Sequence, residues 1–353
     1  MAQQMFVYIL RSLALTARED NVAKLTALFN KNAKVQANVN VTLVTSQEPA
    51  QMNADLIKAI VNIEKSDAVP LPFQTLLKPM HVNQLSNNLK HFTALRMIVE
   101  NTVKTTNTSA ASSRELGGAT PIHVILEDDV LFNDAAVDML LATLEAAPAD
   151  YDMIFLGLPS TKNSAPDGAV SFEKVDGVFK VLPCCDSYVV SAKAAEKLVA
   201  AYLPVRFPTQ IQLSYAMSCT NMVAYMCSPN VFIDGSKLGV YMSSIEQNNQ
   251  LIWNPQYNQI RALLAPKDKT PEKAREDLLS VDALLSKAHF KEHPDFRYLS
   301  ATAHVLSGRY EDARKDFDRA FEVYVAEKCV FGPDCQFMKD YVDVYRHLQV
   351  DFA

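Results

Sequence analysis

Short apolar runs alternate with segments of helical periodicity through the first 265 residues of this 353-residue chain. The run Met5–Leu10 is apolar enough for a buried strand, and apolar residues then recur at helical intervals over 22–29. Alternating apolar and polar residues over 39–43 predict a second strand. The pattern is typical of an α/β domain, which we expect over residues 1–265, with ligands at the carboxyl ends of its strands.

Caps and turns predict where the individual elements begin and end. Thr16 and Glu19 have capping-box spacing for the first helix, and Ser191 is a good N-cap for a later one. A hairpin is expected to turn at Asp176-Gly177, and a polar stretch over 101–119 to form a loop. The remaining expected strands cover 121–126, 151–156 and 187–190, and the remaining expected helices cover 50–64, 85–99, 134–147 and 192–202.

Three acids stand in a row where one predicted strand ends. The run Pro121–Leu126 leads directly into Glu127, Asp128 and Asp129. Adjacent carboxylates repel one another, so a divalent cation with hard oxygen ligands, Mn²⁺ or Mg²⁺, would stabilise them. Because alternate side chains of a strand share a face, we expect Glu127 and Asp129 to point into one cleft as metal ligands, with Asp128 on the other side or toward a ribose. A solvated turn of helix-capping acids is the alternative.

The composition excludes several classes of protein. With 34 Lys and Arg against 40 Asp and Glu, the net charge of -6 offers no surface for gripping a nucleic-acid backbone. Apolar runs stay shorter than the roughly 18 residues of a membrane-spanning helix, so we expect no transmembrane segment. None of the six cysteines forms a CxxC pair, which favours free thiols in a reducing compartment and a cytoplasmic location.

From residue 266 onward the sequence is typical of helices. A charged, Pro-bracketed linker over 266–271 precedes one helix pair with the alternating small and large residues of a tetratricopeptide repeat. These residues are Ala303, Leu306, Gly308, Tyr310, Ala313, Phe317, Ala320 and Phe321. One repeat cannot bury its own apolar face, so helices near 272–286 and 336–349 are expected beside it. We predict a small all-α domain over 266–353, available to a protein partner.

Four segments, in this order along the chain, resemble glycosyltransferase family 25, the lipopolysaccharide-type and procollagen-type sugar transferases. Residues 7–12 resemble the family's N-terminal strand, although Leu10-Arg11 replaces the usual Asn-Leu. Residues 85–95 are similar to its Ser-Leu-Ser-His-Leu helix, and 124–130 to its acidic signature. Residues 186–198 are similar to its Ala-Tyr-Leu-Ile-Ser-Lys-Lys-Ala-Ala segment.

The resemblance covers about residues 5–250 and implies a GT-A-like mixed sheet flanked by helices. It also implies an activity: transfer of a hexose from a nucleotide-diphosphate sugar, UDP-glucose or UDP-galactose, to a hydroxyl of a glycan or protein acceptor. Inversion at the sugar carbon and Mn²⁺ or Mg²⁺ on the diphosphate are part of this expectation. A metal would stabilise the negative charge that accumulates on the leaving diphosphate.

Residue roles follow from the same resemblance. Glu127 and Asp129 are the expected metal ligands, and the expected donor contacts are Leu10, Arg11, Arg18, Thr45, Asn88, His91 and Asp128. The alternative for the two arginines is an ordinary surface charge. The alternative for His91 is a histidine of the core or of the helix surface.

An inverting reaction needs a general base. Asp186 is the first candidate and Asp234 the second, with a hairpin acid and a turn-forming residue as their ordinary structural interpretations. One departure affects this assignment, because Pro208-Thr-Gln-Ile-Gln212 stands where the family commonly has an Asp in a Pro-x-Asp context. Gln210 and Gln212 can bind sugar hydroxyls but cannot accept a proton.

Two other functions are compatible with the same residues. The first is a catalytically silent GT-A-like domain that acts as a binding or scaffold protein through its helical tail. The second is another metal-dependent nucleotide enzyme, such as a nucleotidyltransferase or a sugar-phosphate hydrolase, because acidic strand ends serve many phosphate chemistries.

Overall fold

The computed structural model forms two compact units. Unit 1 comprises residues 1–51, 86–203 and 208–243, and unit 2 comprises residues 52–85, 204–207 and 244–353. The described residues are 4–63, 69–74, 76–77, 79–111, 120–157, 169–175, 184–236, 240–241, 255–264, 270–286, 293–326, 329–330 and 336–348. Unit 2 therefore includes residues 52–85 and 244–265, which the sequence prediction assigned to the first domain.

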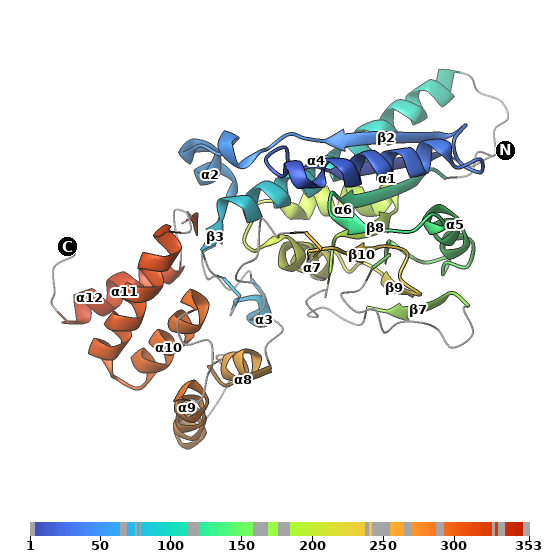
Figure 1. Cartoon of the computed structure of the whole chain (residues 1–353). Helices are drawn as coiled ribbons and strands as arrows, with labels where there is room; N and C mark the ends of the chain where they lie inside the picture. The colour runs from blue at the N-terminus through green and yellow to red at the C-terminus, as the bar shows by residue number, and fades with distance from the viewer. Residues whose placement is uncertain are drawn as a thin grey trace. The chain divides into compact units, whose positions relative to one another are not determined.

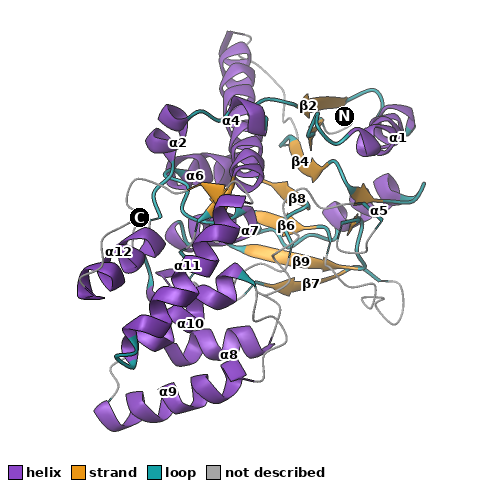
Figure 2. Cartoon of the chain, turned by 60° about the vertical axis from the view of Figure 1, so that its left-hand side comes forward, coloured by secondary structure: helices purple, strands orange, loops and turns teal. Residues whose placement is uncertain are grey.

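Unit 1 is built on a mixed seven-stranded sheet (Figures 1 and 2). Its strands, in spatial order, are β2 (Val39–Val44), β1 (Met5–Leu10), β4 (Ile122–Glu127), β8 (Ser187–Val190), β6 (Met153–Phe155), β9 (Ala224–Ser228) and β7 (Ser171–Lys174). β1 is parallel to β2 and β4, whereas β8 is antiparallel to β4 and β6. β9 is parallel to β6 and antiparallel to β7. This mixed sheet, together with its helices, confirms the predicted α/β fold class.

Helices cover both faces of the sheet because successive side chains of the central strands point to opposite sides. Tyr8 and Leu10 of β1 pack in a core with residues of α4 (Val82–Ala111), α6 (Ala192–Tyr202) and α7 (Thr209–Cys219). Val7 and Ile9 pack in the opposite core with residues of α1 (Glu19–Lys31) and α5 (Ala136–Glu145). Burial on both faces explains why β1 and β4 are apolar almost throughout.

Some local predictions are confirmed. Ser191 caps α6, accepting a hydrogen bond from Ala194 N at 3.1 Å. The helices expected over 134–147 and 192–202 correspond to α5 and α6.

Other local predictions are wrong. Residues 16–18 form a short 3-10 helix, η1, so Thr16 does not cap α1, whose N-cap is Arg18 without a side-chain cap. The helix expected over 50–64 is divided into η2 (Pro49–Gln51) and α2 (Ala54–Ile60), because Asn53 caps the latter. The expected loop is helical as far as Ala111, and the Thr102 hydroxyl bonds back to Ile98 O there.

The strand β2 lies at the edge of the sheet, and Asn40 on it is exposed. Within the described residues, β7 pairs with β9, and the predicted Asp176-Gly177 turn lies outside the described part of the chain. Cys184, Cys185, Cys219 and Cys227 are not in disulfide bonds.

The C-terminal part of unit 2 consists mainly of helices. These are α8 (Pro255–Leu264), α9 (Pro271–Ser286), α10 (Pro294–Leu306), α11 (Tyr310–Ala326) and α12 (Gln336–Leu348). In addition to α2, the short elements described in this unit are α3 (Leu71–Gln74), β3 (Met80–His81) and β11 (Cys329–Val330). The helices predicted near 272–286 and 336–349 are present as α9 and α12.

Aromatic contacts and buried hydrogen bonds are among the interactions that hold these helices together. Phe317 and Phe337 meet edge to face, with ring centroids 5.5 Å apart. Buried acids pair with tyrosines of neighbouring helices, as in the 2.6 Å bond from the Tyr324 hydroxyl to Asp295. Gly308, which ends the turn between α10 and α11, has a φ of +71° that favours glycine.

Across the described residues of both units, no helix combines the length and apolarity needed to cross a bilayer.

The burial of His123 on β4 makes the free energy of unfolding depend on pH. Its ring stacks on Phe6 with centroids 5.3 Å apart, and neither ring nitrogen has a described hydrogen-bond partner. Burial lowers the pKa of His123 to about 4. Since the unfolded chain binds a proton near pH 6.5 and the folded chain does not, stability is complete above pH 6.5 and falls as the pH drops toward 4.

We predict that His123→Leu removes this acid sensitivity. Urea denaturation between pH 7 and pH 4 should show the wild type losing more stability than the variant, by on the order of 3 kcal/mol over the whole range. Equal losses in the two proteins would contradict the assignment of this sensitivity to His123.

Candidate functional site

The candidate site lies where the carboxyl ends of β1 and β4 meet. The chain leaves β1 toward β2 on one side and later enters β4 on the other side of β1. In open α/β sheets this reversal opens a crevice in which ligands bind. Leu10, the last residue of β1, is in register with Glu127, the last residue of β4. The segments that follow these two strands therefore lie at the same edge of the sheet.

The acidic run makes a tight turn after Glu127. Asp128 and Asp129 lie between β4 and β5 (Val130–Leu131), which pairs with β10 (Ile233–Asp234). Asn21 donates to the carbonyls of Asp128 and Val130, both at 3.0 Å. The strand alternation predicted for 127–129 is therefore wrong, because only Glu127 belongs to the strand.

Gly235 is required beside this turn. Its N–H donates to Asp129 O at 3.1 Å, and a Cβ atom at this position would lie 2.5 Å from the same oxygen. No side chain larger than a hydrogen atom fits there without moving the backbone of the acidic turn.

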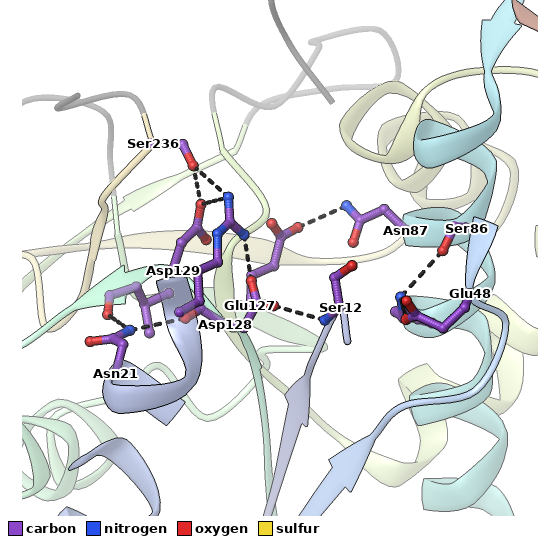
Figure 3. A network of polar contacts seen from close by, with 12 residues as sticks. Ser12, Asn21, Glu48, Ser86, Asn87, Glu127, Asp128, Asp129 and Ser236 are labelled. Carbon is purple, nitrogen blue, oxygen red and sulfur yellow. Dashed lines mark hydrogen bonds and ion pairs between the residues drawn. The ribbon is translucent and has the colours of Figure 1, made fainter. Parts of the chain in front are cut away.

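Arg18 is buried between two of the acids. Its Nη1 donates to Asp128 Oδ1, and its Nη2 lies 3.1 Å from Asp129 Oδ2 and 3.0 Å from Ser236 Oγ. The second oxygen of Asp128 accepts a 2.8 Å bond from Ser12 N, as drawn in Figure 3. Burial lowers the pKa of Arg18, but the charges of Asp129 and Asp128 outweigh it, so the pKa is raised and the guanidinium stays charged.

Asp129 has one satisfied carboxylate oxygen and one orphan. Its Oδ2 forms an ion pair with Arg18 and accepts a hydrogen bond from the Ser236 hydroxyl. Its Oδ1 is buried and has no partner among the described residues. Burial, together with the charges of Glu127 and Asp234, raises the pKa of Asp129 well above its ordinary value, although Arg18 opposes the rise. Among the described residues, no positive group therefore contacts Oδ1 of Asp129.

Glu127 divides its two oxygens in a similar way. Asn87 Nδ2 and His91 Nε2 each lie 3.0 Å from Oε1, and the other oxygen has no partner among the described residues. The same amide group of Asn87 donates to Thr209 Oγ1 at 3.2 Å. Burial acts to raise the pKa of Glu127, but His91, Asn87 and Arg18 outweigh it and lower the pKa to about 2.

The two candidate bases lie together although 48 positions separate them in the sequence. Asp186 Oδ1 accepts a hydrogen bond from the thiol of Cys184. The sulfur of Cys184 also lies 3.6 Å from Asp234 Oδ2. Ser187 donates to the other oxygen of Asp186 at 3.3 Å. Asp186 O also accepts a 2.7 Å bond from Glu127 N, which ties this group to the acidic run.

The loop after β2 is anchored to α4. Lys90, a buried residue of this helix, forms a 2.5 Å ion pair with Glu48. Ser86, one turn earlier, donates to Gln47 O, and Gln47 has a φ of 65°. Thr45, a predicted donor contact, begins this loop and is half-buried.

Several predicted donor contacts have other surroundings. Leu10 belongs to the core, and the fully buried Asn88 accepts from the Tyr202 hydroxyl at 3.2 Å. Arg11 pairs with Glu19 at 2.6 Å near the surface. His91 is fully buried, so the ring-to-donor contact expected from the sequence does not fit this geometry.

Sequence reasoning missed the polar residues that hold the acids in place. These are Ser12, Asn21, Asn87, Thr209 and Ser236. Helical spacing offered a signal for one of them, because Asn87 lies four residues before His91 and so shares its face of α4. Gln212 is buried and donates to Tyr202 O at 2.6 Å, so sugar contact is excluded for that amide in this conformation.

Carboxylate oxygens are the ligands expected for Mn²⁺ or Mg²⁺. The orphan oxygen of Asp129 and the second oxygen of Glu127 fit this requirement. Within the described part of the chain, groups of three possible ligands are His91 with Glu127 and Cys185, and Cys184 with Asp186 and Asp234. Neither group joins Glu127 to Asp129, so the predicted pair would need a further ligand, from solvent or from a substrate.

Comparison with known proteins finds no matching family model and no matching curated protein. Among solved structures, the chain is similar to S. aureus TarS 1–349, a glycosyltransferase, with a TM-score of 0.37 and 8% identity. That likeness covers 98% of this chain and 91% of the other. A TM-score this low carries no argument about activity.

The buried ion pair of Arg18 and Asp128 is expected to be strongly coupled. Arg18→Gln should destabilise the chain by about 3 kcal/mol because it leaves buried carboxylates without a counter-charge. A double-mutant cycle with Asp128→Asn, measured by urea denaturation, should give a coupling energy of about 2 kcal/mol.

The pair of Arg11 and Glu19 is the matched control, because Glu19 is largely exposed and exposed pairs contribute below about 1 kcal/mol. Equal coupling in the two cycles would show that the counter-charge role of Arg18 is wrong.

Proposed function

We propose that this chain is a metal-dependent glycosyltransferase that uses a nucleotide-diphosphate sugar as donor. The observation that carries the proposal is the pair of carboxylate oxygens, on Asp129 and Glu127, left without described partners at the carboxyl edge of the sheet. A cation held there would face the crevice in which such sheets bind their ligands.

Glu127 and Asp129 would hold the metal, with a diphosphate oxygen or water completing its ligands. When bound, a divalent cation stabilises the negative charge that develops on a leaving diphosphate. Arg18 adds a fixed positive charge beside the same acids. Asp128, whose two oxygens bind Arg18 and Ser12, holds that arginine in place rather than contacting a ribose.

The acceptor hydroxyl would lose its proton to Asp186 or Asp234. Its oxygen then forms a bond to the sugar carbon, the bond from that carbon to the diphosphate breaks, and the carboxylate keeps the proton. The pairing of both acids with Cys184 makes them a single group, so removing one changes the surroundings of the other.

The finer identity rests on the sequence resemblance. Family 25 membership, a UDP-hexose donor and inversion are proposed from the four matching segments. The α10–α11 helix pair, with its tetratricopeptide-like residues, is the proposed docking site for a protein partner.

One observation favours a second function. Arg18 already neutralises part of the acidic turn, as a metal would in an active enzyme. A catalytically silent domain that acts through its helical tail is therefore the alternative. The two functions differ in whether the chain binds a nucleotide sugar together with a metal.

We predict that Mn²⁺ and a UDP-sugar together raise the melting temperature, since ligands that bind only the folded state stabilise it by mass action. Differential scanning fluorimetry with UDP-glucose, UDP-galactose, GDP- and CMP-sugars, each with and without Mn²⁺, measures this effect. Asp129→Asn should abolish the metal-dependent part of the shift while keeping the shape of the side chain.

Asp134→Asn is the matched control, because Asp134 is an exposed acid five residues further along the chain. This variant should keep the full shift. A wild type that no nucleotide sugar stabilises would favour the silent domain.

Asp186→Asn is predicted to lower kcat by about 10²- to 10⁴-fold because a general base is lost. The Mn²⁺-dependent stabilisation by donor should persist, since this residue is not assigned to the donor. Steady-state kinetics of Asp186→Asn and Asp234→Asn, once a donor is known, separate the two candidates. A larger kcat loss in Asp234→Asn would reverse the assignment.

A further inference from the structure

His91 lies at the centre of a buried hydrogen-bond chain that joins three elements of unit 1. Its Nε2 is 3.0 Å from Glu127 Oε1 on β4, and its Nδ1 is 2.9 Å from the Tyr188 hydroxyl on β8. The two rings are nearly parallel, with centroids 5.8 Å apart and an interplanar angle of 9°. His91 and Tyr188 are both fully buried, so the imidazole cannot turn without breaking both bonds.

The bonds of this chain have a defined direction. An ionised carboxylate only accepts hydrogen bonds, so Nε2 of His91 donates its proton to Glu127. In neutral His91 the other nitrogen then accepts the hydroxyl proton of Tyr188. Asn87 donates to the same oxygen of Glu127. Oε1 of Glu127 thus receives two donors, whereas Oε2 receives none from the described residues.

We propose that His91 and Tyr188 are positioning residues that hold Glu127 with Oε2 turned toward the bound cation. This inference rests on the proposed function, because it assigns the outer support of the metal site proposed there. It replaces the donor contact that the sequence suggested for His91. A fully buried ring whose two nitrogens are both engaged has no atom left for a nucleotide sugar.

Such support matters because a ligating carboxylate must be held in one orientation. Loss of an outer hydrogen bond to a metal ligand typically weakens metal affinity 10- to 100-fold. When His91 is replaced, Asn87 is the one described donor left on Oε1, so the carboxylate is held by one hydrogen bond in place of two and can rotate more easily. The effect is therefore expected on the affinity for the metal itself, before any sugar is bound.

Titration of the full chain with Mn²⁺ alone, followed by the electron paramagnetic resonance signal of free Mn²⁺, tests the proposal. His91→Leu should weaken binding about 10- to 100-fold. His91→Gln, which keeps a donor nitrogen, should recover most of the loss. Tyr188→Phe removes a single oxygen from the far end of the chain and should weaken binding by a smaller factor.

The matched control is His123→Leu. His123 is also buried in unit 1 and lies on the same strand as Glu127, but it has no hydrogen bond to any described residue. This variant should bind Mn²⁺ as the wild type does. Equal weakening in His91→Leu and His123→Leu would overturn the proposal and leave only a packing effect.

The outcomes separate this inference from the proposed function. A wild type that does not bind Mn²⁺ would refute the metal site and the inference with it. Mn²⁺ binding that Asp129→Asn abolishes and all three His91 and Tyr188 variants retain would support the metal site and refute only the positioning role.

Discussion

The candidate site depends on the burial of two adjacent carboxylates against one guanidinium. Asp128 and Asp129 could not be removed from water in a single turn without a positive partner, and Arg18 is that partner. Its position just before α1 explains why this helix begins at Glu19 without a capping side chain. Folding of the turn after β1 and folding of the turn after β4 are therefore linked by a single charged residue.

The same contacts leave two oxygens without a partner among the described residues. Ser12 and Arg18 take both oxygens of Asp128, Ser236 and Arg18 take one oxygen of Asp129, and Asn87 and His91 take one of Glu127. The network thus neutralises part of the acidic run and leaves one oxygen each of Asp129 and Glu127 without a described partner. This arrangement is compatible with an enzyme in which a metal binds the two remaining oxygens. It is also compatible with a silent domain in which Arg18 alone balances the charge of the acids.

The acidic residues that meet at this edge of the sheet are far apart in the sequence. Glu127 is connected through its backbone to Asp186, and Asp186 through Cys184 to Asp234. The residues proposed to bind the metal and those proposed to accept the proton are therefore linked by hydrogen bonds. Glu127 at the end of β4, Asp186 just before β8 and Asp234 at the end of β10 form one hydrogen-bonded group with Cys184.

The sequence alone determined the fold class, most of the strands and helices, and the position of the acids at the end of a strand. These features depend on local periodicity, which neighbouring residues encode directly. It did not determine that residues 128 and 129 form a turn, that Asn87 rather than Asn88 faces Glu127, or that Arg18 pairs with acids 110 positions away. Those features depend on strand order, register and helix rotation. Tertiary structure decided them because a buried charge takes whichever partner the packed sheet brings within a few ångströms, however distant that partner is along the chain.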